Sequence, residues 1–190
     1  MLIYLHGFNS SPQSKKALLL KRYLEERGLG AHYACPALPH RPEQAIVAIE
    51  AELARHPEAG ICFVGSSLGG FYATWLAEKH QAKAVLINPA ITPHVGLRAF
   101  LGAQQNLYTG EKYELTEQDL AQWERLFVPR VTPERYLLLV ETGDELLDYR
   151  EAVAKYAGAR QVVVQGGDHT LQSFPEHIPL LMEFAAGALA

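Results

Sequence analysis

Short apolar runs alternate along the chain with longer stretches in which apolar residues recur every three or four positions. The apolar runs predict strands at residues 2–5, 31–35, 61–64, 84–87, 136–140 and 161–164. The amphipathic stretches predict helices at residues 14–27, 42–56, 68–80, 147–157 and 175–189. Several runs are apolar on both faces, as in a parallel sheet that is covered on each side. This alternation predicts a compact α/β fold of about six parallel strands with right-handed crossovers.

Residues 88–133 interrupt this rhythm and contain no convincing strand. Thr116 can cap a helix there, with Asp119 three residues later as its partner. A loop of this length is unusual inside a compact domain unless it has a function. We therefore expect one domain over residues 1–190, in which segment 90–133 forms a small helical lid at the carboxyl edge of the sheet. An ordinary helical connection is the alternative.

The composition is that of an ordinary soluble globular protein, with 48% apolar and 20% charged residues. The net charge is −4, and no block of basic residues argues for a nucleic-acid or membrane-surface partner. The apolar start of the chain is too short for a signal peptide or a membrane span, so we expect a cytoplasmic protein. Cys35 and Cys62 are expected to be small buried side chains, without a disulfide or a metal site.

Gly65-Ser66-Ser67-Leu68-Gly69 is the most informative motif, because it fits Gly-x-Ser-x-Gly. It follows the apolar run 61–64 and opens the amphipathic stretch 68–80. A nucleophile elbow requires this strand–turn–helix context, and its glycines stand where side chains would clash. Ser67 is therefore the predicted nucleophile.

A serine hydroxyl needs a base to take its proton and a third group to orient that base. Asp144 follows the apolar run 136–140, and His169 follows the run 161–164. Both therefore come after the carboxyl ends of predicted strands, at the edge of a parallel sheet where ligands bind. Asp144 is the predicted acid and His169 the predicted base.

Other groups compete for these roles. Glu145 and Asp148 lie close to Asp144 in the sequence, and Asp168 adjoins the histidine. Asp148 is better suited to starting the next helix, and Asp168 to a solvated turn. His6 ends the first apolar run, where a buried structural role is the better interpretation.

An oxyanion formed during attack needs backbone N–H donors. The amide of Leu68 opens a helix, whose N-terminus favours negative charge. Gly7 permits a sharp turn that aims the Phe8 amide at the same point. The polar residues that follow predict a helix start with a proline and a capping serine. In the functional alternative, Ser10 or Ser11 lines an acyl pocket.

The segment 90–133 supplies candidate contacts for an apolar acyl group, with packing onto the domain as the alternative for each. These candidates are Leu101, Tyr108, Tyr113, Trp123 and Phe127. An acyl-CoA thioester would also need a basic rim, for which Arg98 and Lys112 are the candidates. No cofactor and no metal are expected.

Together these motifs resemble those of the α/β-hydrolase superfamily and, more narrowly, of the small bacterial YqiA-type esterases. The resemblance covers nearly the whole chain, and the matching segments are 4–12, 65–73, 88–90, 108–111, 142–149 and 166–169. It implies a hydrolase whose sheet starts at the oxyanion-loop strand, and hydrolysis of carboxylic esters or acyl thioesters without a cofactor. The match places the nucleophile on Ser67, the acid on Asp144 and the base on His169. Residues 91–96 depart from the family pattern.

We therefore expect a serine esterase that acts on small-molecule esters with short to medium acyl chains, or on acyl-CoA thioesters. A non-catalytic binding protein with a hydrolase fold is one alternative. An acyltransferase that uses the same three side chains is another.

Overall fold

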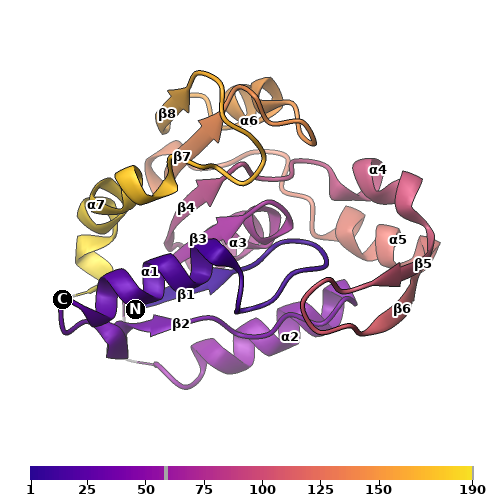
Figure 1. Cartoon of the computed structure of the whole chain (residues 1–190), viewed down its shortest axis with the longest axis horizontal. Helices are drawn as coiled ribbons and strands as arrows, with labels where there is room; N and C mark the ends of the chain where they lie inside the picture. Colours follow the sequence, from indigo (N-terminus) through magenta and orange to yellow (C-terminus); the bar gives the residue numbers. More distant parts are fainter. Residues whose placement is uncertain (58–59, 190) are drawn as a thin grey trace.

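The computed structural model describes residues 1–57 and 60–189 (Figure 1). The strands of its main sheet are β1 (Leu2–Leu5), β2 (Tyr33–Ala34), β3 (Cys62–Ser66), β4 (Lys83–Ile87), β7 (Tyr136–Glu141) and β8 (Arg160–Val164). They form a six-stranded sheet in the order β2-β1-β3-β4-β7-β8, and every pair is parallel. The predicted six-strand parallel α/β fold is thus confirmed.

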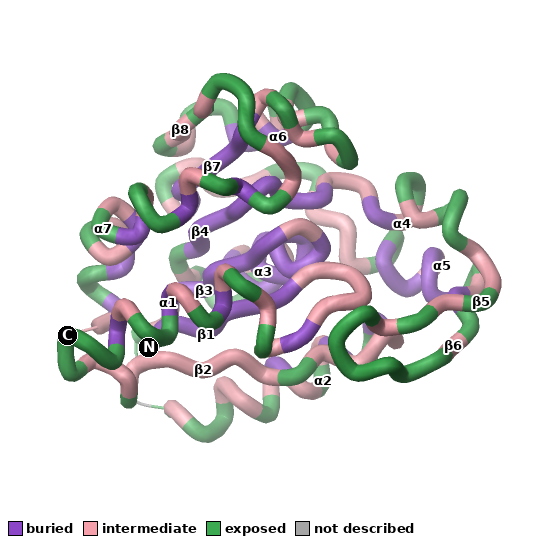
Figure 2. The backbone as a smooth tube through the Cα atoms, in the orientation of Figure 1, coloured by how far each residue is buried: buried purple, intermediate pink, exposed green. Residues whose placement is uncertain are grey.

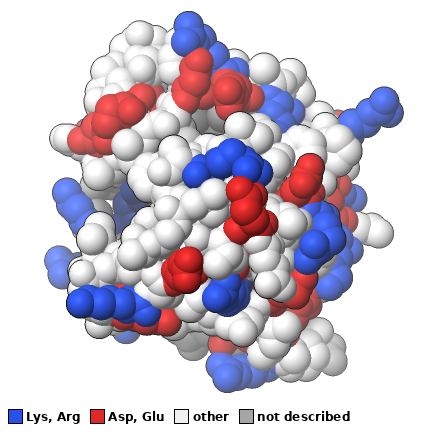
Figure 3. Space-filling view, turned by 90° about the vertical axis from the view of Figure 1, so that its right-hand side faces the viewer, with Lys and Arg blue, Asp and Glu red and all other residues white. Residues whose placement is uncertain are grey.

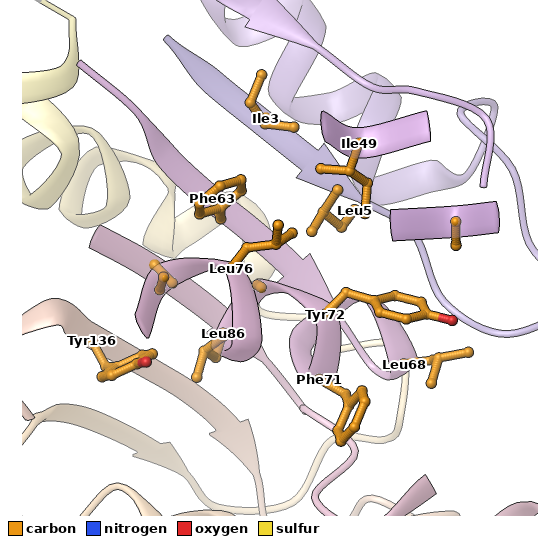
Figure 4. Close-up of a cluster of buried hydrophobic side chains, with 14 of the residues drawn as sticks. Ile3, Leu5, Ile49, Phe63, Leu68, Phe71, Tyr72, Leu76, Leu86 and Tyr136 are labelled. Carbon is orange, nitrogen blue, oxygen red and sulfur yellow. The ribbon is translucent and has the colours of Figure 1, made fainter. Parts of the chain in front are cut away.

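Helices cover both faces of this sheet, and their bounds are α1 (Lys15–Glu25), α2 (Pro42–Leu53), α3 (Leu68–His80), α6 (Tyr149–Lys155) and α7 (Phe174–Ala185). Successive residues of a strand point to opposite faces. Leu2 and Tyr4 of β1 accordingly join the cluster under α1 and α7. Ile3 and Leu5 join the cluster under α2, α3 and α6. Figure 4 shows this second cluster, and Figure 2 shows that the central strands are mostly buried.

The sequence predicts the main elements well, because each strand is a short apolar run between turn residues. The helix Leu68–His80 has the predicted bounds, and the other four predicted helices are shorter in the structure. The predicted strand 31–35 is reduced to Tyr33–Ala34, since Gly30–His32 forms a 3₁₀ turn before it. Cys35 and Cys62 are free thiols, and Cys62 is fully buried.

The segment between β4 and β7 contains α4 (Pro93–Gly96), a 3₁₀ turn (Leu97–Phe100), β5 (Gly102–Gln105), β6 (Lys112–Leu115) and α5 (Glu117–Arg125). The expectation that residues 88–133 hold no strand is wrong, because β5 and β6 pair as an antiparallel hairpin. The predicted helix start is confirmed: the Thr116 hydroxyl and the Asp119 carboxylate form a capping box at α5. The hairpin and α5 lie at the right-hand end of the molecule in Figure 1.

The hairpin is bound to the loop that follows β1. The amide of Leu107 donates to the Asn9 carbonyl oxygen at 3.2 Å, and Asn106 Nδ2 donates to the Ser10 carbonyl oxygen at 2.8 Å. The Tyr113 hydroxyl donates to Asn9 Oδ1 at 2.7 Å. These polar bonds, rather than apolar packing, hold the hairpin tip beside the carboxyl edge of the main sheet.

Gly69 stands where the fold leaves no room for a side chain. A Cβ atom on residue 69 would overlap the carbonyl oxygen of Leu5, because α3 begins directly against β1. We expect Gly69→Ala to lower the free energy of unfolding by about 3 kcal/mol, since relief of this overlap requires a backbone shift in a packed core. Urea unfolding measures the change.

Gly96→Ala is the matched control for this variant, because no atom lies within 4 Å of a Cβ added at Gly96. Its unfolding midpoint should stay close to that of the wild type. Equal midpoints for the Gly69 and Gly96 variants would contradict the close approach of α3 to β1.

Candidate active site

Ser67 stands at a strained turn between β3 and α3. Its φ of 55° and ψ of −121° lie in a region that residues other than glycine rarely adopt. The Ser67 amide donates to the Ile87 carbonyl oxygen, and the Ser67 carbonyl oxygen accepts from the Ala90 amide, both at 3.0 Å. These bonds fix the turn to the end of β4. The geometry is that of the expected nucleophile elbow.

Asp144 follows β7 and His169 follows β8, and their side chains meet. His169 Nδ1 lies 2.8 Å from Asp144 Oδ2 and 3.0 Å from Oδ1. The side chain of His169 is 17% exposed and that of Asp144 is 2% exposed. Asp144 Oδ1 also accepts from the amides of Leu146 and Leu147, at 2.9 and 2.8 Å. The carboxylate is therefore held by its own loop while it faces the imidazole.

Ser67 and His169 line one cavity of about 410 Å³ at the carboxyl edge of the sheet. Its walls are the loop after β1, the start of α1, the hairpin tip and the loop after β8. Because Nδ1 of His169 faces Asp144, Nε2 lies on the other edge of the ring. The structure thus brings all three predicted side chains to one end of the sheet.

The predicted oxyanion donors border the same place. Leu68 is the first residue of α3, and Phe8 lines the cavity beside Ser67. A Cβ atom on Gly7 would lie 3.2 Å from Ser67 Cβ, so the loop after β1 passes in close contact with the serine. Glycine at this position lets the backbone approach the reacting side chain.

His6 holds that loop and has no free ring nitrogen for catalysis. Its Nε2 accepts from the Leu38 amide, so its Nδ1 carries the proton and lies 3.1 Å from the Gly7 carbonyl oxygen. Burial lowers the pKa of His6, which keeps the ring neutral. This is the structural role that the sequence favoured.

The competing acidic residues have other partners. Asp148 is the N-cap of α6 and accepts from the Arg150 amide, as expected. Asp168 accepts from the Thr170 amide and hydroxyl in its own turn. Glu145 accepts from the backbone amide of His169 at 2.9 Å. Of the four candidates, Asp144 is the one whose carboxylate reaches the imidazole.

Two of the predicted substrate contacts line the cavity, namely Ser10 and Tyr108. The other candidates, Ser11, Leu101, Tyr113, Trp123 and Phe127, are not among the residues that line it. Ser11 Oγ accepts from the Gln13 amide in the turn that precedes α1. Leu101 packs against the core. Trp123 is fully buried, because α5 lays its apolar stripe on the domain core, and its indole N–H donates to the Tyr72 hydroxyl.

The two candidates for a basic rim do not line the cavity either. Arg98 pairs with Glu117 at 2.7 Å, and Lys112 stands on β6 away from the cavity. Lys15 and Lys16 at the start of α1 line the cavity instead. Lys16 Nζ donates to the Thr170 carbonyl oxygen at 2.7 Å, and burial lowers the pKa of Lys16 to about 8.

Glu141, the last residue of β7, belongs to the site although no sequence motif singled it out. Its carboxylate is buried and accepts from the amides of Asp168, Gln172 and Ser173 and from the Ser173 hydroxyl, at distances from 2.6 to 3.2 Å. Burial raises the pKa of Glu141, but the bonds from Ser173 and from the two other amides outweigh it, so the net pKa is lowered. Glu141 therefore anchors the loop that carries His169. A charged residue that ends an apolar strand is the signal that was available.

Asn88, at the end of β4, belongs to the site as well. Its Nδ2 donates to the carbonyl oxygens of Asp168 and His169, both at 3.1 Å, and its Oδ1 accepts from the Glu141 amide at 3.0 Å. The side chain is buried, and the backbone has a positive φ of 39°. Asn88 thereby ties the His169 loop to both β4 and β7.

We expect Glu141→Gln to lower the free energy of unfolding at pH 7 by about 1–3 kcal/mol, because an amide cannot accept from all four donors. The pKa of Glu141 is lowered from 4.5, so its carboxylate stabilises the fold above that pH. This contribution is lost as the pH falls through the folded-state pKa. Urea unfolding at pH 7 and at low pH should show that the difference from wild type shrinks on acidification.

Glu114→Gln is the control for this prediction, because Glu114 is exposed on β6. A loss of stability at Glu141→Gln that is the same at both pH values would contradict the role of the charge.

The surface carries charges of both signs. On the face shown in Figure 3, acidic and basic side chains are interspersed without an extended patch of either sign. Among residues 1–57 and 60–189, no helix has the length and apolar character needed to cross a membrane. Within the same residues, no three His, Cys, Asp or Glu side chains gather as metal ligands.

Comparison with known proteins agrees with this fold. Residues 1–186 match the family described as "Uncharacterised protein family (UPF0227)". The UPF0227 protein of Shewanella woodyi (strain ATCC 51908 / MS32) is 26% identical over 94 residues, which are 49% of this chain and 52% of that relative. The chain thus matches about half of the length of this curated relative.

Solved structures of proteins described as hydrolases or esterases share the architecture over nearly the whole chain. Est1E of Butyrivibrio proteoclasticus, with ferulic acid bound, superposes with a TM-score of 0.73 at 18% identity, covering 99% of this chain and 88% of that one. The esterase domain of a Rhodothermus marinus protein superposes with a TM-score of 0.70 at 21% identity, covering 100% and 87%. With its parallel sheet, its elbow turn and a family match from residue 1 to residue 186, the chain belongs to the UPF0227 family and has the α/β-hydrolase fold.

Proposed function

We propose that this protein is a serine esterase that hydrolyses carboxylic esters of short to medium acyl chains. Ser67 attacks the ester carbonyl carbon, and His169 takes the Ser67 proton at Nε2. Asp144 orients the imidazole and stabilises its charged form. The amides of Phe8 and Leu68 donate to the oxyanion that develops on the carbonyl oxygen.

The acyl-enzyme then forms and breaks with the same groups. The C–O bond to the alcohol breaks as His169 gives its proton to the leaving oxygen. Water next attacks the acyl carbon while His169 again accepts a proton. Release of the carboxylic acid restores the Ser67 hydroxyl.

One observation carries the proposal. Ser67, on its strained turn, and His169 line a single cavity, and Asp144 lies 2.8 Å from the His169 imidazole, although the three residues follow three different strands. Two backbone amides fix the Asp144 carboxylate where it faces His169, as is expected of a group that orients a catalytic imidazole. The likeness to the Rhodothermus marinus esterase domain supports the proposal at the level of the fold.

The cavity also bears on the size of the substrate. Its volume of about 410 Å³ is in the lower part of the range for small-molecule sites. Leu107 and Tyr108 form an exposed apolar wall at the hairpin tip, where a short acyl chain can lie. Acyl-CoA thioesters of similar acyl length are a second substrate class for the same chemistry.

The test uses the purified chain with a panel of p-nitrophenyl esters and acyl-CoA thioesters of increasing acyl length. We expect the highest kcat/KM at short or medium length, and labelling of Ser67 by a fluorophosphonate probe, located by mass spectrometry. Absence of both labelling and hydrolysis would overturn the proposal in favour of a binding protein. Transfer of the acyl group to an added alcohol in preference to water would instead identify an acyltransferase.

A further inference from the structure

The cavity beside Ser67 extends to the N-terminus of α1, which lacks the usual side-chain cap. Ser14 occupies the N-cap position, but its hydroxyl forms no capping bond, and no acidic residue stands in the first turn of α1. The first N–H groups of a helix have no partner within it, and the helix dipole favours negative charge there. This end of α1 therefore presents unsatisfied donors beside the cavity.

A buried tyrosine points to the same place. Tyr4 of β1 is fully buried, and it lines the cavity together with Ser14. Among the residues that the structure describes, neither the Tyr4 hydroxyl nor the Ser14 hydroxyl makes a hydrogen bond of standard geometry, although the hydroxyls of Ser14 and Ser66 lie close to that of Tyr4. Buried polar groups without partners are rare in folded proteins, and they lower stability. Both hydroxyls are therefore available to donate to a ligand in this cavity.

The charges around the cavity show which kind of acceptor fits. Lys15 and Lys16 line it, whereas no Asp or Glu of the described chain does. Lys16 Nζ donates to the neutral Thr170 carbonyl oxygen, which leaves two of its three N–H groups for another acceptor. Three carboxylates near Lys16 raise its pKa by charge attraction but do not line the cavity, namely those of Asp168, Glu141 and Asp144. The wall of the cavity is thus positively charged.

We infer that this end of the cavity binds an anionic group, a carboxylate or a phosphate, that the ester substrate carries. The α1 N-terminus, the Tyr4 and Ser14 hydroxyls and the two lysines are the groups that hold it. Water can satisfy the two hydroxyls, but water alone does not account for two lysines without a carboxylate on the same wall. The inference rests on the proposed esterase function and names its substrate class as esters with a negative charge.

The anion can belong to the acyl part or to the alcohol part, so the experiment has two arms. The acyl arm compares mono-p-nitrophenyl glutarate with p-nitrophenyl butyrate. The alcohol arm compares 4-acetoxybenzoate with p-tolyl acetate. In at least one arm we expect kcat/KM to favour the anionic ester by about tenfold, and Lys15→Met and Tyr4→Phe each to reduce this preference severalfold.

Lys21→Met is the matched control, because Lys21 lies on α1 outside the cavity and pairs with Glu25 at 3.7 Å. This variant should retain the wild-type preference for the anionic ester. Absence of a preference in both arms, or a preference that Lys15→Met and Tyr4→Phe leave unchanged, would overturn the inference.

Binding of inorganic phosphate separates this inference from the esterase proposal. Phosphate or glutarate should raise the melting temperature of the wild-type chain in a concentration-dependent way, and should do so less in Lys15→Met and in Tyr4→Phe. Stabilisation equal in all of these proteins would contradict the anion site, whatever the outcome of the Ser67 labelling.

Discussion

Ser67→Ala is expected to lower kcat for an activated ester by about 10⁴-fold or more, with little change in the free energy of unfolding. The variant removes the nucleophilic oxygen, whereas the oxyanion donors and the cavity remain to give a small residual rate. Stability should be retained because the bonds that fix the turn come from the Ser67 backbone, which alanine keeps. A p-nitrophenyl butyrate assay and urea unfolding measure the two quantities.

Ser66→Ala is the control, because it also removes a serine hydroxyl, but from the neighbouring residue at the end of β3. It should still react with a fluorophosphonate probe, whereas Ser67→Ala should not. If Ser67→Ala hydrolysed the ester at a rate close to that of the wild type, the catalytic assignment would be wrong.

The second large effect is expected from Asp144→Asn, with kcat lowered by about 10³–10⁴-fold and KM nearly unchanged. An asparagine can accept the amides of Leu146 and Leu147, so the loop should keep its shape. It cannot stabilise a charged imidazole, and its N–H₂ group favours the tautomer of His169 with the wrong nitrogen protonated. Steady-state kinetics would separate the kcat effect from the KM effect.

Asp148→Asn is the matched control for this variant. Asp148 lies four residues later and caps α6, a task that asparagine performs equally well. Its kinetic constants should stay close to those of the wild type. Equal losses at the two positions would point to a general effect on this loop rather than to the pairing of Asp144 with His169.

The main sheet and the three central side chains could be predicted because both follow from local signals. Apolar runs of four or five residues, as in β1 and β7, predict buried parallel strands, and the residues after them fall at one sheet edge. Ser67, Asp144 and His169 each occupy such a position. Their positions after predicted strands were therefore enough to predict that the three side chains lie close together.

The hairpin could not be predicted in this way. β5 and β6 are short and mostly polar, so they lack the apolar alternation that marks a strand. They are held by their turn, in which Asn106 Oδ1 accepts from the amides of Tyr108 and Thr109 and Gly110 has a φ of 74°. The turn residues Asn106 and Gly110 are visible in the sequence, but the two strands that they join are not recognisable as strands.

The buried polar contacts could not be predicted from the sequence for a different reason. The bonds of Asn88 and Glu141 to the His169 loop join residues that are far apart in the sequence. The position of Trp123 likewise depends on which face α5 turns to the core. Such contacts depend on the register and packing of the folded chain, and one sequence does not reveal them.

The attachment of the hairpin to the loop after β1 couples two events that are often separate in enzymes. Asn9, which receives the hairpin bonds, is the immediate neighbour of Phe8, whose amide is proposed to meet the oxyanion. Any outward swing of the hairpin that widens the entrance therefore also disturbs the donor at the reacting carbon. The same hydrogen bonds therefore affect both substrate entry and the position of the oxyanion donor. A substitution at Asn106, which binds the loop after β1, should change kcat as well as KM.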